Sequence, residues 1–220
     1  IHLFTSAYKE DDSRRREELT FCIERNLKCD AIDYVYLLHE NTDMLSVDHI
    51  KVNSRHISIR PKYSDFLAWA KELTLSVSDI VIIANSDIYF DKSILALSQG
   101  QKPNQCAALS RWDISSSGVP VLFDRNDSQD IWVFRGPLKK IRGDFPVGVP
   151  RCDNRILYEL KQAGYEVINP SFSVRAYHLH SGVRQEYSTE KLEQFVDPPY
   201  AYLWPHNLWS LSRTIIYNLR

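Results

Sequence analysis

The sequence predicts an α/β fold in which a mixed, mostly parallel central sheet is flanked by helices. Apolar β-type segments alternate with segments of helical periodicity along the first half of the chain, as in α/β proteins. The run Ile80–Ala84 is continuously apolar and rich in β-branched residues, which is typical of a strand buried on both faces. Polar side chains follow it directly, and open α/β sheets bind their ligands at the carboxyl ends of strands.

The start of the chain predicts two strands around one helix. Ile1–Ser6 is a β-type run that ends in hydroxyl side chains, and Asp33–Glu40 is a second strand-like run. Apolar residues at helical spacing predict a helix over about Arg14–Lys28, with candidate N-caps in Asp11–Ser13. Its first turn holds three arginines, although the helix dipole disfavours cations there. We favour a solvated face for them; the alternative is a place where a phosphate group binds.

A third strand and two helices surround the buried strand. Alternating isoleucines predict a short strand over Arg55–Arg60. Ser64 can cap a helix whose apolar residues fall at i, i+3, i+4 and i+7. After the buried strand, we expect Asp91 to cap a short helix over Lys92–Ser98 rather than to bind a ligand.

The second half of the chain has weaker but readable signals. Gln105–Asp113 and Gln129–Phe134 are strand-like, and Gly136–Pro150 is mostly loop because it contains three glycines and three prolines. Asp153 or its neighbour then begins a helix that Gly164 ends. Two further short strands are expected over Tyr165–Asn169 and Ser173–His178.

The pattern of elements predicts one catalytic domain. We expect it to cover residues 1–190, with a nucleotide-binding half at about 1–100 and an acceptor half at about 101–190. Residues 191–220 are rich in aromatic side chains, and we expect a C-terminal extension or a link to a following domain. Ile1 stands where an initiator methionine would be expected, so we expect further domains of a longer chain.

Composition excludes several classes of protein. The chain has 220 residues and a net charge of −1, with Lys and Arg interspersed among acids, so we expect no nucleic-acid partner. No apolar run is long enough to span a membrane and no signal peptide is recognisable, so we expect a cytoplasmic protein. The four cysteines form no C-x-x-C pair; we expect reduced thiols, and two disulfides are the alternative.

An acidic motif follows the buried strand. Asn85-Ser86-Asp87 lies where α/β sheets bind ligands, and hard oxygen donors there suit magnesium or manganese that carries a phosphate group. The alternative is that these residues form only a turn. We favour Asp87 as a metal ligand because two other polar groups also occur at element ends.

Those two groups are an aspartate and a pair of histidines. Asp153 begins a helix behind the Gly/Pro loop, where the helix dipole is expected to keep a carboxylate ionised. His178 and His180 follow a late strand, and neutral imidazole is a good ligand for manganese or zinc. The alternatives are a helix N-cap for Asp153 and surface positions for the histidines. Together the three groups suggest a metal-dependent transferase.

The three groups, in this order, resemble those of the GT-A glycosyltransferases. In that family a DxD motif follows a strand and holds manganese against the donor diphosphate. Asn85-Ser86-Asp87 occupies that place with Asn for the first acid, which implies that Asp87 is the main ligand and Asn85 a weaker or water-mediated one. The segments Asn-Ser-Asp-Ile-Tyr-Phe and Tyr-His-Leu-His also resemble the N-terminal domains of chlorovirus glycosyltransferases, which would place the protein in a host cytoplasm.

The resemblance implies a function and a set of residues. It implies transfer of a sugar from a nucleoside-diphosphate sugar, UDP being expected, to a hydroxyl of a glycan acceptor, with manganese or magnesium as cofactor. It implies that Asp153 is the catalytic base and that His178 or His180 completes the metal site. The residues implied to bind the nucleotide sugar are Thr5, Ser6, Tyr8, Arg60, Tyr63, Asn85, Ser86 and Asp87.

Four residues in the second half of the chain are candidates for a sugar pocket. Aromatic rings stack on sugars and carboxylates accept hydrogen bonds from hydroxyls, so the candidates for the sugar pocket are Trp112, Asp113, Asp130 and Trp132. The alternative is that the aromatic residues belong to the core and the acids are solvated.

The rival function is a non-catalytic module that binds nucleotide sugars or glycans, which the missing first acid of the motif favours. A nucleotidyltransferase is disfavoured because no Gly-rich loop with a following Lys occurs near the first helix.

Overall fold

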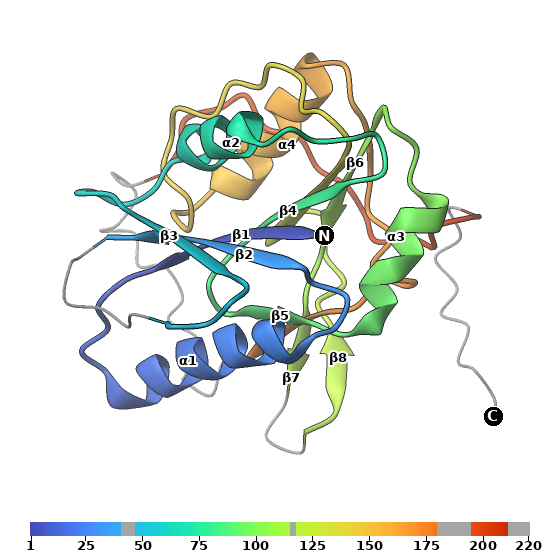
Figure 1. Cartoon of the computed structure of the whole chain (residues 1–220). Helices are drawn as coiled ribbons and strands as arrows, with labels where there is room; N and C mark the ends of the chain where they lie inside the picture. The colour runs from blue at the N-terminus through green and yellow to red at the C-terminus, as the bar shows by residue number, and fades with distance from the viewer. Residues whose placement is uncertain (41–46, 115–117, 180–194, 211–220) are drawn as a thin grey trace.

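The computed structural model describes residues 1–40, 47–114, 118–179 and 195–210. Helices lie on both faces of a central sheet, and a second, smaller sheet packs beside it (Figure 1). The strands are β1 (His2–Ala7), β2 (Tyr34–His39), β3 (Val52–His56), β4 (Ile80–Ala84), β5 (Ile88–Phe90), β6 (Gln105–Leu109), β7 (Trp112–Ile114), β8 (Pro120–Leu122), β9 (Ile131–Arg135), β10 (Glu166–Ile168) and β11 (Ala176–Leu179). The helices are α1 (Ser13–Lys28), α2 (Tyr63–Glu72), the 3₁₀ turn η1 (Lys92–Ile94), α3 (Leu95–Gly100) and α4 (Cys152–Gln162).

The central sheet is mixed and mostly parallel, as predicted. Its seven strands have the order β10-β6-β9-β4-β1-β2-β3. Only β9 runs antiparallel to its neighbours, β4 and β6, and the other neighbouring pairs in this sheet are parallel. Every residue of β4 is buried, which explains its continuous apolar sequence.

Each face of the central sheet has its own hydrophobic core, because side chains alternate between the faces along a strand. Leu3 of β1 belongs to the core under α1 and α3, together with Ile23 and Leu97. Phe4, the next residue, belongs to the opposite core with Phe66 of α2. The helical periodicities in the sequence therefore mark the helix faces that cover the sheet.

The smaller sheet brings together segments that are far apart in the sequence. Its four strands have the order β5-β11-β7-β8, and β11 places His178 opposite both Ile88 and Asp113. The sequence does not predict this sheet, because its pattern joins β6 and β7 into one strand, Gln105–Asp113. At Ser110 the chain leaves the central sheet, and the Ser110 N–H donates to Ser171 Oγ at 2.9 Å. That change of sheet leaves no mark in the hydrophobic pattern.

Two other local predictions were wrong. The third strand lies at Val52–His56 instead of Arg55–Arg60, and most of its residues are exposed, so apolar alternation is a poor guide there. Ser64 does not cap α2, which begins one residue earlier; Asp65 Oδ2 accepts from the Lys62 N–H at 2.7 Å instead. The predicted cap at Asp91 is confirmed, because its carboxylate accepts from the Ser93 N–H at 2.8 Å.

The segment before α4 sets the position of Asp153. Arg151 precedes the helix with φ of 68°, a left-handed conformation that is uncommon for a residue with a side chain. The helix begins at Cys152, so Asp153 lies inside the first turn and is not the N-cap. Gly164 follows the helix with φ of 80°, as expected for a residue that ends it.

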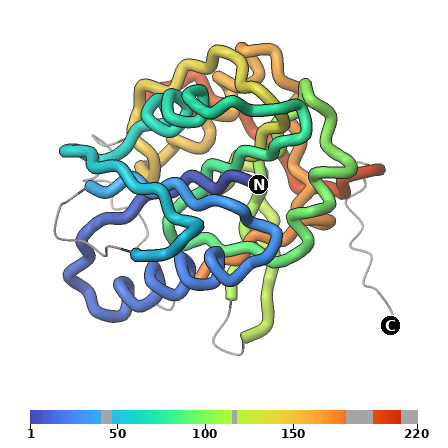
Figure 2. Tube along the Cα trace, viewed as in Figure 1, coloured from blue at the N-terminus to red at the C-terminus, as the bar shows by residue number. Residues whose placement is uncertain are grey.

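Residues 195–210 pack back onto the second half of the chain. The Ala201 N–H donates to Asn154 O at 3.0 Å, and the Leu203 N–H donates to Asn126 O at 2.9 Å. The segment runs from the α4 side of the molecule to the end of α3, where Leu208 packs beside Gly100 (Figure 2). How the chain divides into domains stays a prediction.

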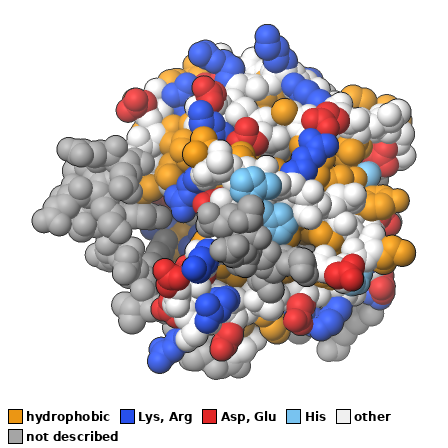
Figure 3. Space-filling model, turned by 60° about the vertical axis from the view of Figure 1, so that its left-hand side comes forward, with side chains coloured by type: hydrophobic (Ala, Val, Ile, Leu, Met, Phe, Trp, Pro, Cys, Tyr) orange, Lys and Arg blue, Asp and Glu red, His pale blue; other side chains and the backbone are white. Residues whose placement is uncertain are grey.

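Three general expectations can be compared with the described residues. All four cysteines are buried and free, as expected for reduced thiols. In the described part of the chain, no helix is both long enough and apolar enough to cross a membrane. Acidic and basic side chains are interspersed on the face seen in Figure 3, in line with the near-neutral net charge.

Candidate functional site

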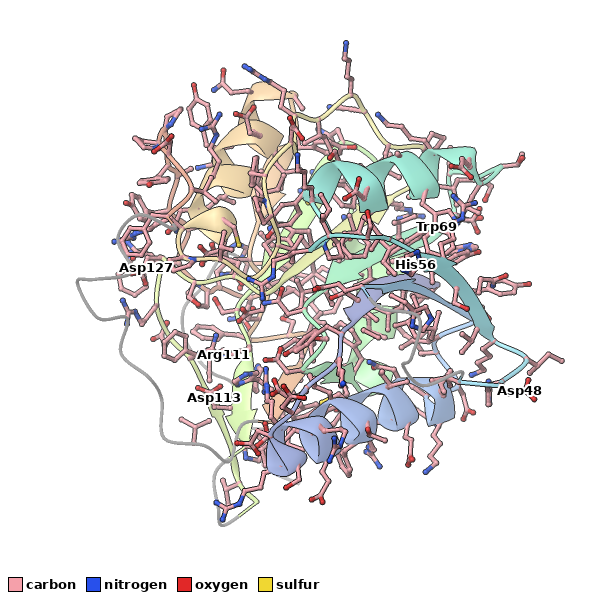
Figure 4. All side chains as sticks on the ribbon, turned by 90° about the vertical axis from the view of Figure 1, so that its left-hand side faces the viewer. Asp48, His56, Trp69, Arg111, Asp113 and Asp127 are labelled. Carbon is pink, nitrogen blue, oxygen red and sulfur yellow. The ribbon has the colours of Figure 1, made fainter. Side chains whose placement is uncertain are left out.

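The candidate site lies at the carboxyl ends of β4 and β1. β4 ends at Ala84, and Asn85-Ser86-Asp87 makes a tight connection to β5, closed by the Ile88 N–H donating to Asn85 O at 3.2 Å. The Asn85 N–H donates to Asp130 O at 3.1 Å, so the connection is also tied to the start of β9. Figure 4 looks onto this edge and shows Arg111 and Asp113 side by side.

Asp87 is held by two cationic groups. Its side chain is only 14 % exposed, and its Oδ2 atom lies 2.5 Å from Arg15 Nη2 and 3.2 Å from His178 Nε2. Burial disfavours a charged carboxylate, but His178 and Arg15 hold the pKa of Asp87 well below its usual range. Asp87 is therefore a permanently ionised carboxylate at the end of the central strand.

His178 bridges two carboxylates. Its Nδ1 lies 2.8 Å from Asp113 Oδ1, while its Nε2 faces Asp87. Burial disfavours the imidazolium, but the hydrogen bonds with Asp113 and Asp87 raise the pKa of His178 to about 9. Ionised Asp113 and Asp87 can only accept, so both nitrogens of the protonated ring donate to these carboxylates. Nε2 would have to lose its proton before it could bind a metal ion. The other candidate, His180, lies outside the described residues.

Arg111 extends the chain of charges toward Asp130. Its Nε donates to Asp113 Oδ1 and its Nη1 donates to Asp130 Oδ2, both at 2.8 Å. Its guanidinium also lies over the Phe123 ring, 4.4 Å from the centroid. Burial opposes ionisation of Asp113, yet His178 and Arg111 lower its pKa. Arg15, Asp87, His178, Asp113, Arg111 and Asp130 thus form one continuous series of ion pairs.

Asp153 has the opposite electrostatic setting. Burial, together with the negative charge of Asp130, raises the pKa of Asp153 to about 7. This overturns the expectation that the helix dipole keeps the carboxylate ionised, because its hydrogen bond from the Asn154 N–H at 2.9 Å does not compensate for the lost water. A carboxylate with a pKa near 7 can take up a proton at neutral pH, which is what a general base must do.

The donor atoms around Asp87 fit a divalent cation in kind. Asn85 Nδ2 donates to Asp130 Oδ1 at 2.9 Å, which fixes the amide so that Asn85 Oδ1 is buried with no hydrogen-bond partner in the described part of the chain. A carboxylate, an amide oxygen and an imidazole nitrogen are ligands that manganese accepts. Within the described ranges, however, no three His, Cys, Asp or Glu side chains are gathered around one point. The structure therefore offers a partial ligand set, with Arg15 on the carboxylate.

The predicted nucleotide residues lie in different settings. Ser6, Tyr8 and Ser86 line a small recess between the end of β1 and α1. Thr5 is buried in β1, and its Oγ1 has no partner among the described residues. Arg60 is exposed in the connection between β3 and α2. These roles stay predictions, and the recess brings only part of the predicted set together.

The predicted aromatic and tyrosine positions are buried. Tyr63 is 1 % exposed, with its ring 4.9 Å from that of Trp132 and its hydroxyl 3.6 Å from Cys152 Sγ. Trp112 donates from Nε1 to Ser171 O at 2.9 Å. These rings pack in the core of this structure, in contrast to Asp113, whose side chain is 41 % exposed.

Two residues of the site were missed by sequence reasoning. Arg15 carried a signal, since three arginines at the start of a helix oppose its dipole, but nothing in the sequence distinguishes it from Arg14 and Arg16. Arg111 carried none, because its role depends on the change of sheet after β6. Both are placed by contacts between segments far apart in the sequence.

Comparison with known proteins bears on the fold. No protein-family model matches this sequence, and no curated protein does. Among solved structures, TarS of S. aureus in complex with UDP-GlcNAc has a TM-score of 0.53 at 10 % identity, covering 84 % of this chain and 61 % of that chain. A mannosyltransferase from Pyrobaculum calidifontis in complex with GDP-Man and Mn²⁺ has a TM-score of 0.51 at 13 % identity, covering 84 % and 58 %.

A third solved structure is similar to the same degree. GalNAc-T7 with UDP, GalNAc and Mn²⁺ has a TM-score of 0.51 at 9 % identity, covering 84 % of this chain and 44 % of that chain. The chain thus spans less than two thirds of the length of each of these structures. The protein has a GT-A-like fold. At such low identity the likeness carries no further, and the resemblance to chlorovirus glycosyltransferases stays a prediction.

Proposed function

We propose that the protein is a metal-dependent glycosyltransferase that moves a sugar from a nucleoside-diphosphate sugar to a hydroxyl group of a glycan acceptor, with UDP as the nucleotide that the sequence resemblance implies. The observation that carries the proposal is the pairing of two carboxylates at one sheet edge. Asp87 is held ionised and Asp153 has a pKa of about 7, and a series of ion pairs runs between their neighbourhoods. The GT-A-like fold supports it.

The donor end of the site is assigned to Asp87 and its neighbours. Asp87 would hold manganese or magnesium together with Nε2 of His178, once that nitrogen has lost its proton, and with Asn85 Oδ1, which has no hydrogen-bond partner among the described residues. When bound, the cation would offset negative charge on the departing nucleoside diphosphate. The proposed contacts of the nucleotide are Ser6, Tyr8 and Ser86, which line the recess, together with Thr5 of β1 and the exposed Arg60 before α2.

The acceptor end is assigned to Asp153. Its ionised form would take the proton of the acceptor hydroxyl as the oxygen bonds to the anomeric carbon, and the bond from that carbon to the diphosphate oxygen breaks. General base catalysis of this kind typically contributes ~10²–10⁴-fold. Burial raises the pKa of Asp153, and the charge of Asp130 supports this role by raising it further. Half-exposed Asp113 is the best placed of the proposed sugar contacts, because its second oxygen can accept from a hydroxyl.

The alternative is a module that binds a nucleotide sugar or glycan without transferring it. Two observations favour it: Asn85 stands in place of an acid, and Arg15 occupies the Asp87 carboxylate. Donor hydrolysis separates the two functions, because a transferase leaks free nucleoside diphosphate in the presence of metal and a binding module does not.

To test the proposal, the 220-residue protein is incubated with UDP-sugars and Mn²⁺, and the released UDP is measured. We expect release by the wild type and its loss in Asp87→Asn, with folding retained. Asp91→Asn is the matched control, because Asp91 lies four residues further on and caps η1, and Asn caps a helix about as well. Tight Mn²⁺-dependent UDP binding without hydrolysis or transfer would support the binding module. If no nucleoside diphosphate binds, both functions are wrong.

A further inference from the structure

Arg15 points inward from a helix turn that should repel it. It lies in the first turn of α1, where the dipole disfavours cations, yet its side chain is only 22 % exposed. Arg14, its neighbour in the same turn, is exposed. A solvated face, the interpretation favoured from the sequence, therefore does not describe Arg15.

The guanidinium of Arg15 joins α1 to the metal-binding motif. Its Nη2 lies 2.5 Å from Asp87 Oδ2, and its Nη1 donates to Glu18 Oε2 at 3.0 Å. Glu18 is one turn along the same helix and its side chain is 7 % exposed. Burial opposes the charge, but Asp87 and Glu18 raise the pKa of Arg15 above its usual value. Glu18 thus holds the guanidinium at the site from its own helix.

The position of Arg15 conflicts with a cation on Asp87. Arg15 and His178 both approach the same oxygen, Oδ2, so a cation shared by Asp87 and His178 would lie against the guanidinium. Two positive charges at this separation repel, and the repulsion is strong where water is excluded. Arg15 must therefore leave Asp87 when the carboxylate takes a metal ion.

The start of α1 borders a small recess, lined among others by Ser6, Tyr8, Glu10, Arg16 and Ser86. At about 10 Å³ this recess has room for one water molecule and not for a diphosphate. A donor diphosphate would therefore lie outside the recess, with its negative charge within reach of the Arg15 side chain. The planar guanidinium fork matches phosphate oxygens in a bidentate manner.

We propose that Arg15 is an exchangeable cation of the donor site: it neutralises Asp87 while the site is empty and binds the donor diphosphate once a divalent cation holds Asp87. This inference rests on the proposed function and adds to it a residue that recognises the diphosphate. It also explains how Asp87 can form an ion pair with Arg15 in the empty site and still bind a metal ion.

The proposal predicts opposite changes in two affinities. Arg15→Met keeps much of the side-chain length and removes the charge. Because Arg15 no longer competes for Asp87, Mn²⁺ alone should bind about tenfold more tightly. Because the phosphate contact is lost, UDP in saturating Mn²⁺ should bind about tenfold more weakly. Arg14→Met, which changes the same charge in the same helix turn, should leave both affinities within about twofold.

The measurements are titration of Mn²⁺ followed by electron paramagnetic resonance of the free ion, and calorimetry of UDP at saturating Mn²⁺. Thermal melting of each variant checks that it is folded. A second variant, Arg15→Lys, keeps the charge without the fork, and should bind UDP more weakly than wild type with Mn²⁺ affinity nearly unchanged. It provides the test if Arg15→Met does not fold.

The outcomes separate this inference from the proposed function. Opposite changes in Arg15→Met, or the selective loss of UDP affinity in Arg15→Lys, support it. If wild type binds UDP with Mn²⁺ and the Arg15 variants bind both ligands as wild type does, or lose both in parallel, Arg15 is a structural ion pair and the inference is wrong while the function stands. If wild type binds no UDP, the proposed function fails and the inference fails with it.

Discussion

The two ends of the site place the same chemical group in opposite states. Asp87 and Asp153 are both aspartates at the carboxyl edge of the sheet, and burial disfavours ionisation of both. Asp87 has Arg15 and His178 against one oxygen, and its pKa falls well below the usual range. Asp153 has the negative charge of Asp130 nearby, and its pKa rises to about 7.

The contrast shows that neighbouring cations outweigh burial at Asp87, whereas at Asp153 burial is the main cause of the raised pKa and the charge of Asp130 adds to it. A permanently ionised group suits the binding of a cation, and a group that titrates near neutrality suits proton transfer. Arg111 lies between the two ends, because it donates to Asp113 on one side and to Asp130 on the other. Substitutions can therefore disrupt either end of the site alone, or both ends together.

The largest effect is expected at the acceptor end. Asp153→Asn keeps the size of the side chain and removes the basic oxygen, so transfer should fall by at least ~10²-fold while UDP affinity and metal dependence stay as in wild type. Because Asp153 lies inside the first turn of α4 and is not its N-cap, the fold should persist. Single-turnover transfer and calorimetry on the same samples measure both quantities.

A matched control for this variant is Asp127→Asn. Asp127 lies near β9 and pairs with Arg125 at 2.7 Å in an exposed ion pair, so its loss should change transfer by less than about threefold. Near-normal transfer by Asp153→Asn, with an unchanged melt, would remove Asp153 from the chemistry. Asp113 and Asp130 would then be the next candidates for the base.

A smaller effect is expected when Arg111, which lies between the donor and acceptor ends, is replaced, and it should change the function of both ends. Arg111→Met leaves Asp113 and Asp130 without their shared guanidinium, and removing one partner of a buried ion pair costs about 3 kcal/mol of unfolding free energy. Binding of Mn²⁺ and transfer should weaken together, because His178 is oriented by Asp113. Denaturant unfolding and metal titration measure the two effects.

Arg125→Met provides the comparison for Arg111. Arg125 lies 5.4 Å from the same Phe123 ring, and its side chain is 53 % exposed. Its loss should change the unfolding free energy by no more than about 0.5 kcal/mol. Equal destabilisation by the two substitutions would mean that stacking on Phe123 matters and that the ion pairs of Arg111 do not.

The smallest effect is a pH dependence of stability that comes from Asp153. Its pKa is about 7 in the folded protein against 3.8 for an ordinary aspartate, so the folded state keeps a proton that the unfolded state has lost between these values. Stability should therefore fall as pH rises from about 4 to 7, and the fall should be complete above pH 7. Other groups titrate in this range, so the contribution is taken as a difference between variants.

Asp153→Asn supplies that difference. Its unfolding free energy minus that of wild type should grow by about 3 kcal/mol between pH 4 and 7, as measured by denaturant unfolding at each pH. Asp127→Asn should show no such growth. A difference that is constant with pH would mean that Asp153 is ionised throughout, as the helix dipole alone would predict.

Much of the central sheet could be predicted from the sequence, because local patterns determine it. Ile80–Ala84 is apolar at every position since both faces of β4 are covered by helices. The positions of Asp87 and Asp153 at element ends also follow from local signals: an apolar run that stops, and a helix that starts. β3 is an edge strand whose residues are mostly exposed, so no apolar pattern marks it, and the position predicted for it was wrong.

The tertiary structure decided which charges meet. In the sequence, Asp87 is separated from Arg15 by 72 positions and from His178 by 91 positions. The smaller sheet that aligns His178 with Asp113 also has no recognisable pattern in the sequence. A pKa depends on charges within a few ångströms in space, whatever their separation along the chain. The sequence by itself therefore determined where carboxylates stand at the edge of the sheet, and only the folded arrangement decided that Asp87 is ionised and that Asp153 titrates near neutrality.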